Sequence, residues 1–392
     1  MNDEKVARDR DKDAVQDEVE SDPPPSVIRA SMKGARRAAA PYVTATRIAL
    51  ARLARSRAAR FAAMVLAAVF VVAVLADVLA SELPVLCRWR GAVYVLPCVT
   101  HPQALAGLDC QAMRRDSTGG DWLVPPLVSY GPTEKSADPA EALLPPFHGG
   151  HPFGTDALGR DVFARVVHGA RTALELGLGA SAALAAIGLV LGALAGFAGG
   201  TVDAIVTRLV ESLTAIPTLV LVIVVCAVVP HPTTATMLWT IALTRWTDLS
   251  RLVRAEVLRA LGTDYVTAAR ALGASPARVL RRHVLPNAIG PAIVAVAFGV
   301  ASVVLTEAAV DFLRVGPPST MASWGEALGE ARSHASAWWL VAFPGAALLA
   351  TLVALNVVGE AARDALDPNL RGVELWQGAT GMASRMTRTS AR

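Results

Sequence analysis

The stretch GTDYVTAARALGASPARVLRRHVLP occupies residues 262–286 and forms a polar, arginine-rich island between long apolar segments. The helix-capping and helix-ending residues within it predict two short helices. Thr263 or Asp264 can cap the first helix, and Gly273 can end it in the left-handed conformation that glycine adopts at low cost. The chain is therefore expected to be organised around a structured polar loop.

One face of the first predicted helix consists of small side chains with an aromatic residue at its edge. Its members recur at three- and four-residue spacing and are Tyr265, Ala268, Ala269, Leu272 and Gly273. Small side chains let a second surface approach the backbone closely, so this face is suited to a groove on another protein. The alternative is a solvated membrane loop that only keeps positive charge on one side.

The second predicted helix begins at Ser275–Pro276, with the serine as N-cap and the proline at the first helical position, where a missing N–H is harmless. It carries a cluster of basic residues: Arg278, Arg281, Arg282 and His283. Pro286 is expected to close it.

The composition indicates an all-α, polytopic membrane protein. The chain has 392 residues, of which 53% are hydrophobic, and a mean hydropathy of +0.44. Several runs exceed the roughly 18 apolar residues that mark a membrane helix. The net charge of +4 comes from arginines clustered in particular loops, with no basic stripe interleaved with exposed aromatics. Nucleic-acid binding is therefore not expected.

The N-terminal segment at 1–60 is predicted to be cytoplasmic. Residues 1–25 are polar and acidic and end in a triple proline, a composition typical of disorder. Residues 29–60 are rich in arginine and contain no acidic residue, and they directly precede the first apolar run at 61–80. The positive-inside rule then places the N-terminus in the cytoplasm, and the pattern does not fit a cleaved signal peptide.

The segment at 81–150 is predicted to be an extracytoplasmic insertion, because it follows the first span and contains no further span-length apolar run. Residues 87–95 alternate around Arg90-Gly91, which favours a small β-hairpin. Cys87, Cys98 and Cys110 lie in this insertion, and two of them could pair as a disulfide in any of three ways. Metal ligation together with His101 is the weaker alternative, since the spacing fits no common zinc pattern.

Six transmembrane helices are expected in total. After the first at 61–80, they lie at about 172–197, 205–229, 234–243, 290–310 and 340–358. The fourth has the weakest pattern, because Arg245 and Asp248 follow within its helical continuation. This count places both termini and the loop at 262–286 in the cytoplasm, the core at 151–371, and a cytoplasmic tail at 372–392.

Glycines recur at four-residue intervals in the second span, at Gly188, Gly192 and Gly196. Such spacing favours close backbone packing between two membrane helices.

No sequence feature predicts catalysis or proton relay. The chain has no phosphate-binding loop of the Gly-x-x-x-x-Gly-Lys type. Glu211, Glu307 and Asp311 are expected near span ends, where water solvates them, and Arg208 is expected to pair with Glu211. Trp324 and the pair Trp338-Trp339 are of the kind that favours the membrane interface. The chain is thus expected to move a solute with energy supplied by a separate ATPase.

The stretch at 262–286 resembles the "EAA" loop of ABC-importer permeases, in which a small-residue helix, a glycine and a downstream Leu-Pro dock the permease onto its ATPase. The resemblance implies that coupling depends on Asp264, Tyr265, Thr267, Ala268, Ala269, Leu272, Gly273, Leu285 and Pro286. Thr267 stands where that motif has an acidic residue, so the ion pair which that residue would make is not expected.

A second motif lies just before the second span and reads HPFGTDALGRD. Its conspicuous residues are His151, Pro152, Gly154, Thr155, Asp156, Gly159, Arg160 and Asp161. Taken alone, they favour turns and helix capping over a metal or catalytic site. The motif resembles the HPxGTDxxGRD signature of the C-type permease subunits of dipeptide, oligopeptide and nickel importers.

These resemblances imply a type I ABC-importer permease fold in the bacterial inner membrane. They also imply three kinds of protein partner: a second, homologous permease forming a heterodimer, two P-loop ATPase subunits, and an extracytoplasmic solute-binding protein. The chain itself would bind no cofactor and would not be an enzyme, because ATP and Mg belong to the ATPase subunits. The insertion at 81–150 would cap the outer pore or contact the binding protein.

The resemblance points to peptides as the solute, with nickel or a metal chelate as the alternative. Two other classes remain open. A secondary transporter would show inverted repeats and midplane charges, which are not evident. A membrane scaffold or sensor would leave the small-residue helix without a purpose.

Overall fold

The computed structural model describes residues 56–117, 119–136, 138–316 and 322–366. The segment predicted at 1–60, apart from residues 56–60, and the tail predicted at 372–392 lie outside the described residues. All further statements concern the described residues.

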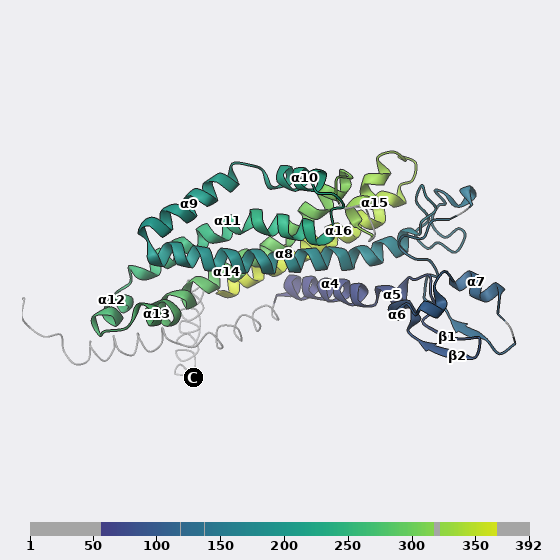
Figure 1. The fold of residues 1–392 in the computed structure, drawn as a ribbon, viewed down its shortest axis with the longest axis horizontal. Coiled ribbons are helices and arrows are strands. Elements are labelled where there is room, and N and C mark those ends of the chain that lie inside the picture. Colours follow the sequence, from purple (N-terminus) through teal and green to yellow (C-terminus); the bar gives the residue numbers. More distant parts are fainter. Residues whose placement is uncertain (1–55, 118, 137, 317–321, 367–392) are drawn as a thin grey trace, which may run out of the picture. The chain divides into compact units, whose positions relative to one another are not determined.

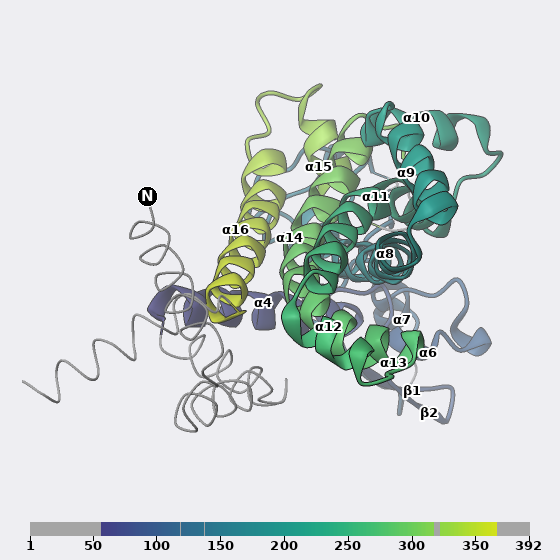
Figure 2. The same cartoon turned by 90° about the vertical axis from the view of Figure 1, so that its left-hand side faces the viewer.

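The long helices form a bundle (Figures 1 and 2). They are α4 (Arg57–Val74), α8 (Val162–Ala198), α9 (Gly200–Thr214), α10 (Thr218–Val228), α11 (Thr234–Leu261), α14 (Leu285–Phe312) and α16 (Trp339–Leu366). α11 packs along α8, α14 contacts both α8 and α16, and α4 lies against α16 and α8. The short helices α12 (Asp264–Ala271) and α13 (Pro276–Val279) lie at one end of this bundle, which we call the α12 end.

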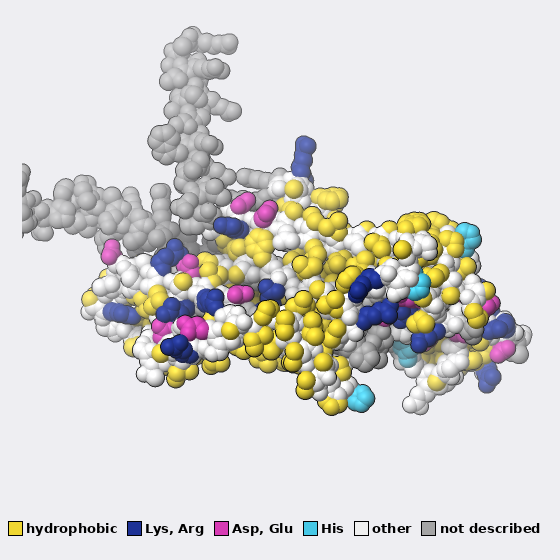
Figure 3. Space-filling view, turned by 90° about the horizontal axis from the view of Figure 1, so that it is seen from above, with side chains coloured by type: hydrophobic (Ala, Val, Ile, Leu, Met, Phe, Trp, Pro, Cys, Tyr) yellow, Lys and Arg dark blue, Asp and Glu magenta, His cyan; other side chains and the backbone are white. Residues whose placement is uncertain are grey.

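The opposite end carries a small sheet and is called the sheet end. Here lie the short elements α5 (Ala76–Leu79), α6 (Pro97–Thr100), η1 (Gln103–Leu105), α7 (Cys110–Arg115), η2 (Pro139–Glu141) and α15 (Trp324–Ala331). In the face shown in Figure 3, charged side chains gather toward the two ends, with a mainly apolar band between them. This distribution suits a bundle that crosses a membrane.

Four helices are long and apolar enough to cross a membrane: α4, α8, the helical run at 276–312 that contains α14, and α16. α9 and α10 together pass the same test as a fifth, although they are bent by 78° at the break that contains Pro217. The kink predicted at this proline is confirmed. α11, which contains the predicted fourth span, is a continuous helix of 28 residues but fails on composition, because its second half carries the expected charges.

The glycines at 188, 192 and 196 pack closely against another helix, as predicted, and that helix is α11. A Cβ atom added to Gly192 would lie 2.5 Å from the Ser250 carbonyl oxygen, and one added to Gly188 would lie 2.9 Å from that of Trp246. At Gly196 the nearest backbone atom is the Arg254 carbonyl oxygen, at 3.0 Å. The three glycines therefore form a seam along which α8 and α11 approach backbone to backbone.

Pro286 does not close a helix, contrary to expectation. α13 passes directly into a π-helical turn, η3 (Leu280–Val284), and then into α14, where Pro286 occupies the first turn. A π turn widens the backbone, and the first turn of a helix tolerates a residue without an N–H. The polar loop is thus continuous with the following span.

The hairpin predicted around Arg90-Gly91 is confirmed. β1 (Leu86–Trp89) pairs antiparallel with β2 (Ala92–Val95), and the two turn residues have φ values of 49° and 83°. A third strand that was not predicted, β3 (Trp122–Val124), pairs with the other edge of β1, giving the order β2-β1-β3. Three residues are too short a run to show alternation in the sequence.

Candidate functional site

The motif at 151–161 forms successive turns that lead into α8. Asp161 is the N-cap: one carboxylate oxygen accepts a hydrogen bond from the Ala164 N–H at 2.6 Å, and the other lies 2.7 Å from His151 Nδ1. His151 is buried and stacks on Tyr130. The prediction of turn and capping chemistry is confirmed for this pair.

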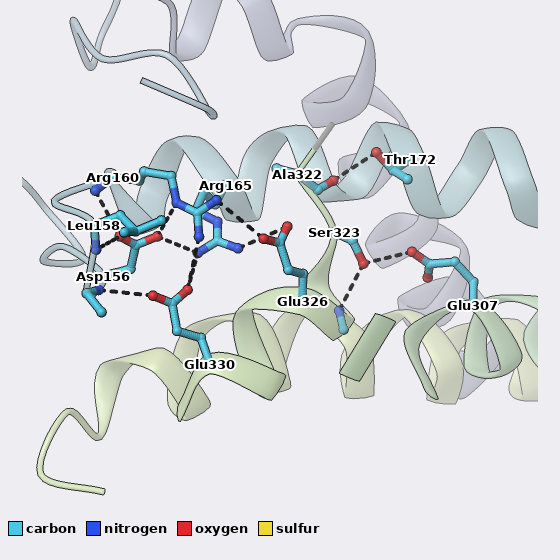
Figure 4. Close-up of polar contacts among 12 residues, drawn as sticks. Asp156, Leu158, Arg160, Arg165, Thr172, Glu307, Ala322, Ser323, Glu326 and Glu330 are labelled. Atoms are coloured by element: carbon cyan, nitrogen blue, oxygen red, sulfur yellow. Dashed lines mark hydrogen bonds and ion pairs between the residues drawn. The ribbon is translucent and has the colours of Figure 1, made fainter. Parts of the chain in front are cut away.

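Asp156 lies at the centre of a buried ion network (Figure 4). One of its oxygens accepts from the backbone N–H groups of Leu158 and Arg160, which shapes the turn. The other lies 2.6 Å from Arg160 Nε and 2.5 Å from Arg165 Nη1. Asp156 is fully buried, so its charge is balanced by guanidinium groups rather than by water.

Two acidic residues of α15 complete the network. Glu330 Oε2 lies 2.8 Å from Arg165 Nη1 and 3.1 Å from Arg160 Nη2, and its other oxygen accepts from the Ala157 N–H. Glu326 contacts the same two arginines at 3.2 and 3.3 Å. Burial by itself would lower the pKa of Arg160, but the charges of Asp156, Glu326 and Glu330 outweigh it and raise that pKa. The network ties the motif and the start of α8 to α15.

Two tryptophans of this region are buried anchors rather than interfacial residues. Trp324 Nε1 donates to the Val166 carbonyl at 2.8 Å, and Trp339 Nε1 donates to the Thr155 carbonyl at 2.9 Å. Trp338 alone of the three is exposed. The interfacial prediction is therefore wrong for Trp324 and Trp339, because α15 and the start of α16 fold back onto the motif.

Other residues of the motif and of the following turns also hold neighbouring segments. Thr155 Oγ1 donates to the Glu141 carbonyl at 2.5 Å and accepts from the Leu144 N–H. Arg171 Nη2 lies 2.8 Å from Asp77 Oδ2, which joins α8 to α5. The remaining motif residues, Pro152, Gly154 and Gly159, belong to the turns, with both glycines at positive φ.

Glu307 departs most from expectation. It was predicted near a span end with access to water, but it is 1% exposed and accepts a hydrogen bond from Ser323 Oγ at 2.8 Å. Ser323 precedes α15, which covers this part of α14. Asp311, one turn further along α14, is only partly buried. The predicted pair of Arg208 and Glu211 is confirmed at 3.2 Å, with both side chains largely exposed.

The face predicted for docking on α12 is open to solvent. Leu272 is 88% exposed and Tyr265 is 46% exposed, while Ala268 is exposed and Ala269 half-buried. Asp264, Thr267 and Gly273 are exposed as well, and Gly273 has the left-handed conformation predicted for it, with φ of 81°. Thr263 is the N-cap residue, but its hydroxyl donates to the Ala260 carbonyl instead of capping the helix.

Two contacts that the sequence did not reveal fix α12 to the rest of the protein. Val266, the next residue after Tyr265, is fully buried in the main apolar core. The Tyr265 hydroxyl accepts from Asn287 Nδ2 at 2.7 Å, and the same amide donates to the His283 carbonyl. α12 is thus anchored to the start of α14, close to Leu285 and Pro286, with its small-residue face free.

The three cysteines of the insertion are free thiols in the structure and form no disulfide. Cys87 and Cys98 belong to one apolar cluster beneath the sheet, and Cys110 is equally buried. Burial raises the pKa of Cys98 and raises that of Cys110 to about 12, so both behave as small apolar side chains. Among the described residues, no group of three or more His, Cys, Asp or Glu is placed to hold a metal ion.

Comparison with known proteins assigns the chain to a family. Residues 188–372 match the family described as "Binding-protein-dependent transport system inner membrane component". The chain is 37% identical over 222 residues to the oligopeptide transport system permease protein OppC of Bacillus subtilis, covering 56% of this chain and 72% of that protein. The chain belongs to this family of permeases.

Two further relatives extend the match. The dipeptide transport system permease protein DppC of Bacillus subtilis is 37% identical over 59% of this chain and 72% of its own length. The di/tripeptide transport system permease protein DppC of Pseudomonas aeruginosa is 37% identical over 64% of this chain and 82% of its own length. This permease is therefore a multi-pass membrane protein, in agreement with its apolar helices.

Proposed function

We propose that this permease moves peptides across the bacterial inner membrane as one subunit of an ATP-driven importer. Its relatives are named as oligopeptide, dipeptide and di/tripeptide transport permeases, which supports a peptide over nickel as the solute. The chain acts by changing shape and not by catalysis. It binds no cofactor, since ATP and Mg are used by the ATPase subunits.

The observation that carries this proposal is the geometry of α12. A short helix with an exposed face of small side chains is held to the bundle by the buried side chain of Val266 and by the Tyr265–Asn287 hydrogen bond. Small side chains allow a groove of a second protein to close around the helix backbone. A push on α12 is passed directly to α11 before it and to α14 after it.

The proposed assembly contains a second, homologous permease, two P-loop ATPase subunits at the α12 end, and a binding protein at the sheet end. The termini and α12 face the cytoplasm in this arrangement, because the arginine-rich segment before α4 follows the positive-inside rule. The sheet and the motif at 151–161 then lie outside, where the binding protein delivers the solute.

Affinity purification of the tagged permease from mild detergent tests the assembly. Mass analysis should find a homologous permease and P-loop ATPase chains in constant proportion, and the reconstituted complex should hydrolyse ATP faster when binding protein and peptide are added. Recovery of the permease alone would contradict the proposal.

A pair of matched variants tests the docking face. Ala268→Trp places a large side chain on the exposed face of α12 and should abolish co-purification of the ATPase chains. Ala277→Trp makes the same change at an exposed position of α13, outside the face, and should leave co-purification unchanged. Equal effects of the two substitutions would exclude α12 as the docking element.

A further inference from the structure

A cavity of about 520 Å³ opens at the sheet end of the bundle. Its volume lies within the range of about 300–1,000 Å³ that is usual for small-molecule sites. Thr172 and Leu176 of α8 and Met237 of α11 form part of its lining. Its charged side chains come from the motif at 151–161, from the loop before that motif, from α15 and from the end of α14. The cavity thus lies where the bundle helices meet the segment that follows the sheet.

Some of the charged side chains around the cavity already have an ion-pair partner within the protein, and others do not. Arg160 is paired with Asp156 and with the two acidic residues of α15, so it belongs to the ion network. Arg314 and Lys135 also line the cavity, and both are exposed. Among the described residues, neither side chain has a hydrogen-bond or ion-pair partner. Two cationic side chains therefore remain available to a ligand.

Three carboxylates line the cavity, and two of them, Glu326 and Glu330 of α15, are already paired with Arg160. The third is Asp311. Asp311 is half-buried at the end of α14 and lines the cavity three residues before Arg314. Its immediate neighbours are Ser323 and the buried Glu307. The cavity consequently presents an anionic group close to cationic ones, next to an uncharged portion of wall.

This arrangement is complementary to a zwitterion. A guanidinium binds a carboxylate through two parallel hydrogen bonds, and a partly buried carboxylate favours an ammonium group. A peptide with free termini carries the required charges at its two ends and an uncharged backbone between them.

We propose that this cavity is a peptide-binding subsite of the permease, in which Arg314 and Lys135 bind the C-terminal carboxylate and Asp311 binds the N-terminal ammonium. The inference rests on the proposed function and adds a recognition site within this subunit. It makes the permease selective for peptides with free termini, in addition to any selection by the binding protein.

The test measures uptake into proteoliposomes that contain the complete importer, with binding protein in saturating amount. The probes are one labelled tripeptide with a free carboxylate and the same tripeptide with a C-terminal amide, each checked for loading onto the binding protein. Arg314→Gln should lower uptake of the free acid about tenfold, as expected for loss of a charge-assisted hydrogen bond, and should leave uptake of the amide unchanged. Lys135→Gln should act in the same direction.

Arg332→Gln is the matched control. Arg332 is an exposed arginine at the same end of the protein, stacked over Phe312 and outside the cavity lining, and its loss changes the net charge equally. If Arg314→Gln and Lys135→Gln lower uptake of acid and amide alike, or act no differently from Arg332→Gln, the subsite is excluded. If the unmodified importer takes up neither peptide, the proposed function itself fails, a result distinct from a lost discrimination.

Discussion

Arg165 is a fully buried cation that pairs with three carboxylates, those of Asp156, Glu326 and Glu330. It is 1% exposed and lies 2.5 Å from Asp156 and 2.8 Å from Glu330. Removing one partner of a buried ion pair leaves an uncompensated charge in a region of low dielectric constant. Exposed pairs behave differently, since water replaces the lost partner.

Arg165→Met should therefore destabilise the permease by about 3–5 kcal/mol. Arg208→Met removes the exposed partner of Glu211 and should cost about 1 kcal/mol or less. Thermal unfolding midpoints of the two purified variants in the same detergent provide the comparison. Similar midpoints would mean that the network around Asp156 is solvated in the protein.

Local residue chemistry was predictable, and long-range pairing was not. Asp161 caps α8 as its position in the motif indicated, because capping depends only on residues a few positions apart. Glu330 is separated from Arg165 by 165 residues, and no sequence pattern joins the two. Glu307 was misplaced for the same reason: the helix that buries it, α15, lies within a stretch that reads as an interfacial loop.

The seam between α8 and α11 depends on the absence of side chains. At Gly192 a methyl group would lie 2.5 Å from a backbone oxygen that cannot move without shifting α11. Gly299 on α14 is also helical, but a Cβ atom there would meet nothing within 4 Å. The two positions differ in packing while sharing the same backbone geometry.

Gly192→Ala is expected to destabilise the bundle by about 1–3 kcal/mol through overpacking. Gly299→Ala is expected to be neutral or slightly stabilising, because alanine has the higher helix propensity. The measurement is again the thermal midpoint in detergent. A fall in midpoint for Gly299→Ala equal to that for Gly192→Ala would show that the seam has no special role.

The elements with strong hydrophobic periodicity, or with clear turn and helix-ending residues, were predicted well. The apolar spans, the hairpin and the helix ending at Gly273 follow from patterns within one segment. The helix end predicted at Pro286 was wrong, because a π turn precedes the proline and the helix continues through it. β3 was missed because its pairing is set by β1, more than thirty residues earlier in the chain.

The topology of the whole molecule can be tested with thiol reagents, since all four native cysteines are buried. Burial holds the pKa of Cys110 at about 12, so its reactive thiolate is scarce at neutral pH, and Cys87 and Cys98 are equally inaccessible. Labelling of a newly introduced, exposed cysteine can therefore be measured without background labelling of the native cysteines.

Ser117→Cys, at the sheet end, should react with a membrane-impermeant maleimide added to intact cells at neutral pH. Ala271→Cys, on α12, should react only after the membrane is permeabilised. Both positions are exposed in the protein, so a difference in labelling reflects the side of the membrane. The reverse pattern would invert the proposed orientation.

At the scale of the whole molecule, the order of the spans was predicted from hydropathy and charge, while their packing was not. Hydropathy indicates which segments lie in the membrane. Which helices pack against one another depends instead on the shapes of the side chains along their full length. Only the glycine spacing on α8 indicated a packing surface, and it did not identify α11 as the partner.

The glycine seam has a mechanical consequence. α8 has 37 residues and is therefore about 55 Å long, nearly twice the roughly 30 Å thickness of a bilayer core. Fastened to α11, it forms a stiff lever whose one arm borders the cavity at Thr172 and Met237 and whose other arm leads through α11 into α12. A rotation of about 10° around its midpoint displaces each tip by about 5 Å in opposite directions, and displaces Thr172, about 12 Å from the midpoint, by about 2 Å. In the proposed importer, this lever would pass a displacement of α12 to the cavity wall without local unfolding between them.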